Sequence, residues 1–218
     1  MTRFYWAAVI ALTLLAWGAS AAVYPQLPDK VPTHWNIRGE IDGYGAKSWA
    51  AFLVPEMMLA MLGLFWLLPW LSPRSFEVDR FRATYLWIAV LVISLMAYIQ
   101  GLTLWAAFNR EVDVARALVA GICVCLALVG NVLGKVRRNF WVGIRTPWTL
   151  ASERVWIDTH RLAARLMSVA GVLGAVIAMF AGHVVAFIIP FGLIMTAALA
   201  PVVYSLVHYK RLQRRGEI

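Results

Sequence analysis

Charged residues are scarce in this chain of 218 residues. Only 14% of its residues are charged and 62% are hydrophobic, and the mean hydropathy is +0.73. Soluble domains average about a quarter charged residues and roughly half apolar residues. The composition therefore excludes an ordinary soluble domain, and no segment of the chain resembles one.

Cysteine is nearly absent. The two cysteines, Cys123 and Cys125, both lie within one apolar run. Residues at positions i and i+2 of a helix do not face each other, and the spacing matches neither a disulfide framework nor a zinc site. We interpret both as small packing residues. The HExxH pattern of zinc proteases is also missing, and no motif calls for a cofactor.

Acidic residues are few as well: eleven Asp and Glu against twenty Lys and Arg give a formal charge of +9. Most basic residues lie in short loops between apolar runs rather than on one soluble face. The excess of Lys and Arg in the cytoplasmic loops of membrane proteins explains this distribution. We therefore expect no direct binding to nucleic acid.

The apolar residues fall into six runs, each near the ~20 residues needed to cross ~30 Å of hydrocarbon. We predict an all-α, polytopic helical bundle that forms a single membrane domain over residues 1–218. The predicted spans are 4–23, 49–71, 84–108, 114–134, 162–182 and 184–207. Two glycine pairs favour close helix packing: Gly130 with Gly134, and Gly171 with Gly174.

Lysine and arginine also predict the orientation, because the basic side of a membrane protein is cytoplasmic. Fifteen of the twenty fall on one side of the predicted bundle. These are Arg3, Arg74, Arg80, Arg82, Lys135, Arg137, Arg138, Arg145, Arg154, Arg161, Arg165, Lys210, Arg211, Arg214 and Arg215. Both termini and residues 135–161 are then cytoplasmic, and residues 24–48 are outside.

The outer loop at residues 24–48 is rich in Pro, Gly, Asp and Asn, which favour turns over regular secondary structure. We expect a compact, structured cap without regular elements. A loop of this length is more than a connector, so we interpret it as a ligand-contact surface. His34, Glu40 and Asp42 offer metal ligands, but one imidazole with two carboxylates matches no metal signature, and we predict no metal site.

Two polar residues, Glu56 and Gln100, lie within predicted spans at a similar depth below the outer side. An ionisable group in a span usually faces the bundle interior or a water-filled cavity. We predict that Glu56 and Gln100 share a polar pocket below the cap. In the outer turn at residues 109–113, sequence NREVD, the acidic residues are expected to pair with Arg110 and Arg116.

The stretch Gly143–Arg161, with the sequence GIRTPWTLASERVWIDTHR, precedes the fifth span. Thr146 followed by Pro147 is typical of a helix start. Thr149 and Ser152 offer an alternative start one turn later. From there we expect the helix to run on into the span.

On that helix Glu153, Trp156 or Ile157, and His160 share one face. A second face holds Arg154, Asp158 and Arg161 or Arg165, with the spacing of i,i+4 ion pairs. A catalytic role for Glu153 and His160 lacks a nucleophile and the additional ligand that a zinc site needs. We interpret the segment as an interfacial helix, with its Trp side chains at headgroup level and its Arg residues near lipid phosphates.

The same stretch resembles the signature of the SdpI family of bacterial membrane proteins. The outer sequence LPDKVPTHWNIRGEIDGYGAK resembles a domain of unknown function found at the N-terminus of that family. The cytoplasmic positions that match the signature are Gly143, Arg145, Thr146, Pro147, Trp148, Thr149, Ser152, Trp156, Thr159, His160 and Arg161. We add Glu153 to them as a candidate partner contact. The outer positions that match the domain are His34, Trp35, Asn36, Gly39 and Gly43. We add Asp42 to them as a candidate ligand contact.

The resemblance implies a non-enzymatic, multi-pass protein of the bacterial cytoplasmic membrane that gives immunity to a secreted peptide toxin. It also implies a receptor role, in which the protein holds a small repressor at the membrane when toxin is present. The implied partners are membrane lipids, the toxin outside and the repressor inside. The alternative function is a small transporter or channel around the Glu56–Gln100 pocket.

Overall fold

The structure, a computed structural model, describes residues 2–109 and 113–218. Its frame is six helices that are long and apolar enough to cross a membrane, which confirms that part of the fold prediction. They are α1 (Thr2–Val23), α2 (Lys47–Trp70), α3 (Arg82–Phe108), α4 (Val114–Leu133), α6 (Glu153–Phe180) and α7 (His183–Arg214). The short helical elements are η1 (Tyr24–Gln26), η2 (Arg74–Phe76), η3 (Val78–Phe81) and α5 (Pro147–Ala151).

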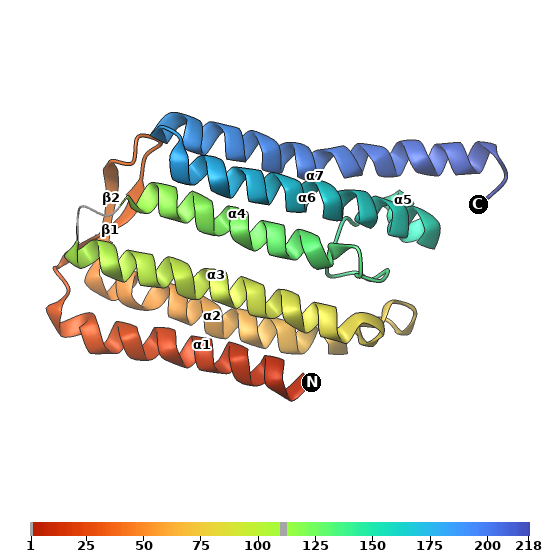
Figure 1. Cartoon of the computed structure of the whole chain (residues 1–218). Helices are drawn as coiled ribbons and strands as arrows, with labels where there is room; N and C mark the ends of the chain where they lie inside the picture. The colour runs from red at the N-terminus through yellow and green to blue at the C-terminus, as the bar shows by residue number, and fades with distance from the viewer. Residues whose placement is uncertain (1, 110–112) are drawn as a thin grey trace.

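The long helices form two groups of three (Figure 1). In the first half, α1 and α2 pack against α3; in the second half, α4 and α7 pack against α6. Helices α3 and α4 lie side by side and join the halves. Figure 1 places both termini at one end of the bundle, here called the terminal end. The connection between α1 and α2 lies at the opposite end, here called the hairpin end.

Glycine brings α4 and α6 close together, as the sequence predicts. A Cβ atom on Gly130 would lie 2.7 Å from the backbone nitrogen of Ser168. A Cβ atom on Gly171 would lie 2.6 Å from the backbone nitrogen of Ala127. Contacts this short leave no room for a side chain, so the two backbones pack directly against each other.

The connection at residues 24–48 is not a cap made only of turns. It contains a two-stranded antiparallel hairpin, β1 (Lys30–Trp35) and β2 (Ile41–Ala46). Gly43 pairs with His34 across the hairpin, and a Cβ atom on Gly43 would lie 2.7 Å from the His34 Cβ. Glycine in β2 thus makes space for a cross-strand neighbour, whereas the sequence analysis took it as a sign of turns.

The predicted polar pocket shared by Glu56 and Gln100 is wrong. Glu56 is exposed on the outer surface of α2. The Gln100 side chain is 1% exposed, and its Nε2 donates to the Ser20 Oγ at 2.9 Å. Two carbonyl oxygens of α2 accept from the same nitrogen at 2.9 and 3.2 Å. Gln100 therefore joins α1, α2 and α3, and Glu56 takes no part in that contact.

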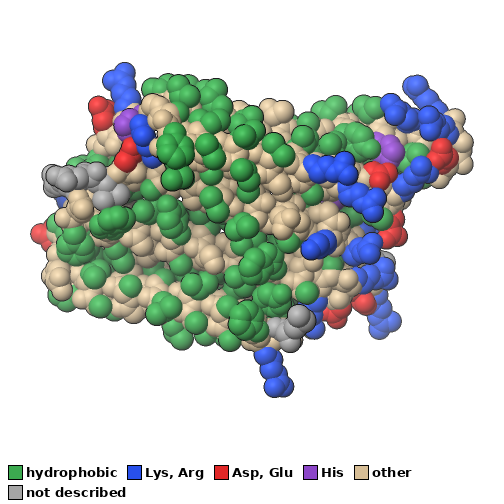
Figure 2. Space-filling view, viewed as in Figure 1, with side chains coloured by type: hydrophobic (Ala, Val, Ile, Leu, Met, Phe, Trp, Pro, Cys, Tyr) green, Lys and Arg blue, Asp and Glu red, His purple; other side chains and the backbone are tan. Residues whose placement is uncertain are grey.

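Side chains of different kind occupy different zones of the surface (Figure 2). Hydrophobic side chains cover the middle of the bundle, and Lys and Arg gather at the terminal end. Helix α6 begins at Glu153, well before the predicted span, and α7 continues to Arg214. Both helices therefore carry their charged ends beyond the apolar zone, while the orientation of the bundle in a membrane stays a prediction.

Candidate functional site

The turn of the hairpin is built around Asn36. Its Oδ1 accepts from the backbone N–H groups of Arg38 at 2.9 Å and Glu40 at 3.1 Å. Its Nδ2 donates to the Glu40 carboxylate at 2.8 Å. Such side-chain bonds to nearby backbone are typical of Asn in turns. Gly39 completes the turn at φ +80°, a conformation that side chains disfavour.

This hairpin belongs to the first half of the chain but docks on the second. A Cβ atom on Gly39 would lie 2.8 Å from the His183 ring, at the start of α7. Trp35 packs beside the buried side chains of Leu102 and Val114, which belong to α3 and α4. The hairpin therefore bridges the two halves of the bundle.

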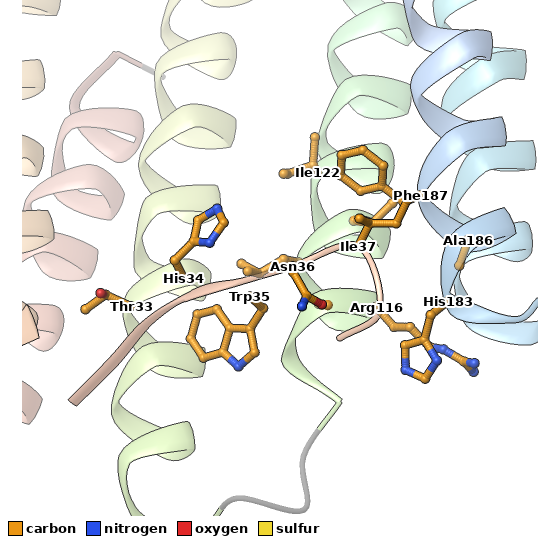
Figure 3. Close-up of a pocket in the computed structure, with 13 residues that line it drawn as sticks. Thr33, His34, Trp35, Asn36, Ile37, Arg116, Ile122, His183, Ala186 and Phe187 are labelled. Atoms are coloured by element: carbon orange, nitrogen blue, oxygen red, sulfur yellow. The ribbon is translucent and has the colours of Figure 1, made fainter. Parts of the chain in front are cut away.

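A pocket of about 240 Å³ lies between the hairpin and the second half (Figure 3). Its wall is largely apolar and comes from α4 and α7. In Figure 3 the side chains of Ile37, Ile122 and Phe187 converge on one side of it. This volume is below the ~300–1,000 Å³ of sites for drug-sized ligands, so it suits one or two apolar side chains of a larger ligand.

Polar groups at the pocket pair mainly with one another. The Asp113 carboxylate forms ion pairs, lying 3.0 Å from the Arg116 Nε and 2.9 Å from the His183 Nε2. It also caps α4 by accepting from the Arg116 backbone N–H at 3.2 Å. His34 lies 2.5 Å from Asp42, and this pair is largely exposed, so its contribution to stability is small.

The predicted outer residues therefore gather at one place. His34, Trp35 and Asn36 line the pocket, Gly39 contacts its rim, and Asp42 and Gly43 adjoin His34. The sequence analysis missed the wall residues of the second half, which are Ile122, His183 and Phe187. The expected pair of Asp113 and Arg116 is confirmed, whereas Arg110 and Glu111 lie outside the described residues.

At the terminal end the signature stretch folds around His160. The His160 ring is fully buried; its Nε2 accepts from the Ile144 backbone N–H at 3.0 Å. Its Nδ1 lies 2.8 Å from the Trp156 carbonyl oxygen. The imidazole is therefore neutral and carries its proton on Nδ1, because Nε2 must remain an acceptor. Gly143, at φ +111°, approaches so closely that a Cβ atom would lie 2.3 Å from Nε2.

The helix starts predicted in this stretch are both used. Thr146 caps α5 and exchanges hydrogen bonds with Thr149, with Pro147 as the first helical residue. Ser152 then interrupts the helix and caps α6 by accepting from the Val155 N–H at 3.4 Å. The Thr146 hydroxyl also lies 3.1 Å from that of Ser205. These hydroxyl groups fix the stretch against α7.

Trp156 does not lie at headgroup level, contrary to the sequence interpretation. Its side chain is 0% exposed and its Nε1 donates to the Val136 carbonyl at 2.8 Å. Its ring stacks on His160 with centroids 4.0 Å apart. Glu153 is exposed. The face shared by Glu153, Trp156 and His160 is therefore divided between solvent and core, because the loop after α4 covers only its later part.

Two charged side chains of α6 pair with α7 and with the residues that follow it rather than along their own helix. Asp158 lies 3.0 Å from the His208 Nε2, and Arg154 pairs with Glu217. The predicted ion pair of Arg154 with Asp158 is thus replaced by one link to α7 and one to the residues after it.

Asn139 is a structural residue that the sequence analysis missed. It is fully buried, and its Oδ1 accepts from the N–H groups of Trp141 and Val142 at 2.7 and 2.8 Å. The available signal was its position shortly before Gly143, because Asn and Gly together favour turns. Most signature residues are likewise buried. Arg145, Pro147 and Arg161 are exposed, and Trp148 is partly so.

Two family models match these two regions. Residues 135–205 match the SdpI/YfhL protein family, and residues 11–59 match a domain of unknown function, DUF1648. The second half of the chain is thus similar to the SdpI/YfhL family. The first match covers the stretch around His160 and its contacts with α7, and the second covers the hairpin.

The chain is similar to the immunity protein SdpI of Bacillus subtilis (strain 168). The two are 27% identical over 203 residues, which is 93% of this chain and 95% of the relative. The similarity therefore spans both halves of the bundle. No solved structure matches the chain.

Proposed function

We propose that this protein is a non-enzymatic immunity protein that protects its cell from a secreted peptide toxin. The observation that carries the proposal is the pocket at the hairpin end. It combines an apolar wall with a hydrogen-bonding rim at His34, Asn36 and His183. An extended peptide offers both features that such a site recognises, an apolar side chain and a polar backbone. The similarity to an immunity protein supports this reading.

The proposed location is the bacterial cytoplasmic membrane, with the hairpin end outside. The gathering of Lys and Arg at the terminal end supports this orientation. Both termini and the signature stretch are then cytoplasmic, and the pocket faces the space through which a secreted toxin arrives.

The proposed mechanism is binding without chemistry. Two histidines at the pocket, His34 and His183, each have an aspartate partner. Among the described residues, no group of three His, Cys, Asp or Glu side chains is arranged to hold a metal ion. We propose that the His34–Asp42 and His183–Asp113 pairs hold the rim of the pocket in shape.

Signalling to a cytoplasmic repressor is the finer part of the proposal, and α7 supplies a physical connection. His183 at its start lines the pocket, and Ser205 near its end contacts Thr146 of the signature stretch. The rise of a helix places these ends about 33 Å apart. Toxin transmits a signal only if it binds two states of the bundle with different affinity. The exposed Arg145 and Arg161 are the proposed repressor contacts.

The test uses a toxin-sensitive host with each variant present in the membrane at the same level. Ile122→Trp fills the pocket, while Ile188→Trp adds the same side chain at an exposed position of α7 that does not line it. We expect wild type and Ile188→Trp to raise the lethal toxin concentration, and Ile122→Trp to lose that protection. Killing that is unaffected by wild type, or full protection by Ile122→Trp, would sink the proposal.

A second arm separates signalling from protection. Arg145→Ala and Arg161→Ala change only the terminal end, so protection should persist while membrane capture of a tagged repressor is lost. Capture that continues in both variants contradicts the assigned contact surface.

A further inference from the structure

Three arginines share a small pocket at the terminal end, away from the toxin site. Arg80, Arg137, Arg138 and Glu153 line its volume of about 240 Å³. Each side of the pocket comes from a different segment: η3, the loop after α4, and the first residue of α6. Two segments far apart in the chain, η3 and the loop after α4, therefore direct positive charges into one space.

These positive charges are not balanced within the protein. Across residues 2–109 and 113–218, no carboxylate lies within ion-pair distance of Arg80, Arg137 or Arg138. Glu153 lines the pocket and offsets one of the three charges without pairing with any of them. The net formal charge of about +2 favours an anion, since guanidinium groups bind phosphate oxygens through paired hydrogen bonds.

Arg138 is already held in place for such a role. Its Nη1 donates to the Leu150 carbonyl at 3.0 Å, and its guanidinium lies 5.4 Å from the centre of the Phe76 ring. A side chain fixed beforehand loses less conformational entropy when a ligand binds. Its remaining N–H groups are left for an external acceptor.

The pocket also lies at a junction between the two halves. The rings of Phe76 and Phe140 are 4.3 Å apart, and the Trp141 Nε1 donates to the Ser72 Oγ at 2.6 Å. Both contacts join the connection between α2 and α3 to the loop after α4. A ligand held by Arg80 on one side and Arg137 on the other would connect the halves at this end.

We propose that this pocket binds a phosphate-type dianion, either free phosphate or the phosphate headgroup of an anionic lipid, and thereby fastens the two halves together at the terminal end. The toxin pocket at the opposite end is not involved.

The test uses the full chain in maltoside micelles, which contain no phosphate. One arm titrates inorganic phosphate at constant ionic strength by calorimetry. The other adds phosphatidic acid and counts retained lipid by native mass spectrometry.

Arg137→Gln should weaken binding roughly tenfold through loss of a charge-assisted bond. Glu153→Gln should tighten binding, because it removes the negative charge that lines the pocket. Arg74→Gln is the matched control, since this exposed arginine lies in the same connection as Arg80 but outside the pocket.

Binding of phosphate alone supports the proposal with free phosphate as ligand, and retention of lipid alone supports it with the headgroup as ligand, provided that Arg137→Gln weakens either. The proposal is overturned if neither ligand distinguishes wild type from Arg137→Gln. It is equally overturned if Arg74→Gln weakens binding as much, because the attraction would then be general surface charge.

Discussion

Replacing Gly143 with alanine places a methyl group where the His160 ring already lies. The added carbon would be 2.3 Å from the His160 Nε2, inside any van der Waals contact. The ring cannot retreat freely, because it is fully buried and stacked on Trp156. We therefore expect the Ile144 N–H···Nε2 hydrogen bond to break.

The expected cost has two parts. Alanine at φ +111° adds backbone strain of about 1–3 kcal/mol. Loss of the bond to His160 leaves a buried polar group without a partner, at about 1–3 kcal/mol. Together they lower the free energy of unfolding by about 2–6 kcal/mol, or the melting temperature by roughly 5–20 °C for a chain of this size.

Tryptophan fluorescence during heating of the purified protein in detergent measures this change. Gly216→Ala is an informative control, because Gly216 also has a positive φ, +67°, but no atom of the described residues lies within 4 Å of an added Cβ. It should lose about half as much stability, roughly 1–3 kcal/mol, since only the strain remains. The reasoning would be refuted if Gly143→Ala melts at the same temperature as wild type. It would also be refuted if Gly216→Ala lowers the melting temperature as much as Gly143→Ala does.

Three further predictions use the same melting assay. Trp156→Phe keeps the buried ring but removes the indole donor, so it should cost about 1–3 kcal/mol. Gly39→Ala, at φ +80° and against the His183 ring, should cost about 1–3 kcal/mol and also reduce protection from toxin in the growth assay. Gln100→Leu should destabilise by about 1–2 kcal/mol through lost bonds between helices, whereas Glu56→Gln should melt with wild type because Glu56 is exposed.

The long helices could be predicted because each apolar run carries its own signal in its length and composition. Close packing at Gly130 and Gly171 was predictable for the same reason, since a residue without a side chain indicates close approach wherever it lies. The depth of Glu56 and Gln100 followed from their positions in the runs. The direction in which each side chain points depends on how neighbouring helices pack, and the local sequence does not indicate that packing.

The candidate sites were predictable in place and less so in role. Gly43 reads locally as a turn former, yet its function is set by His34 across the hairpin. Trp156 reads as an interface residue, yet the loop after α4 buries it. His183 lies between two predicted spans and was not predicted as a site residue. Its role depends on the hairpin that docks on it, and the local sequence does not indicate that contact.

The docking of the hairpin on α7 ties the binding surface to the order of synthesis. Chains are made from the N-terminus, so the hairpin, completed at Ala46, exists long before His183 and Phe187. A chain that stops before α7 lacks the α7 side of the pocket wall and the His183 ring that contacts Gly39. Helix α7 thus completes the pocket that the hairpin began, and the pocket forms only after α7 has been made.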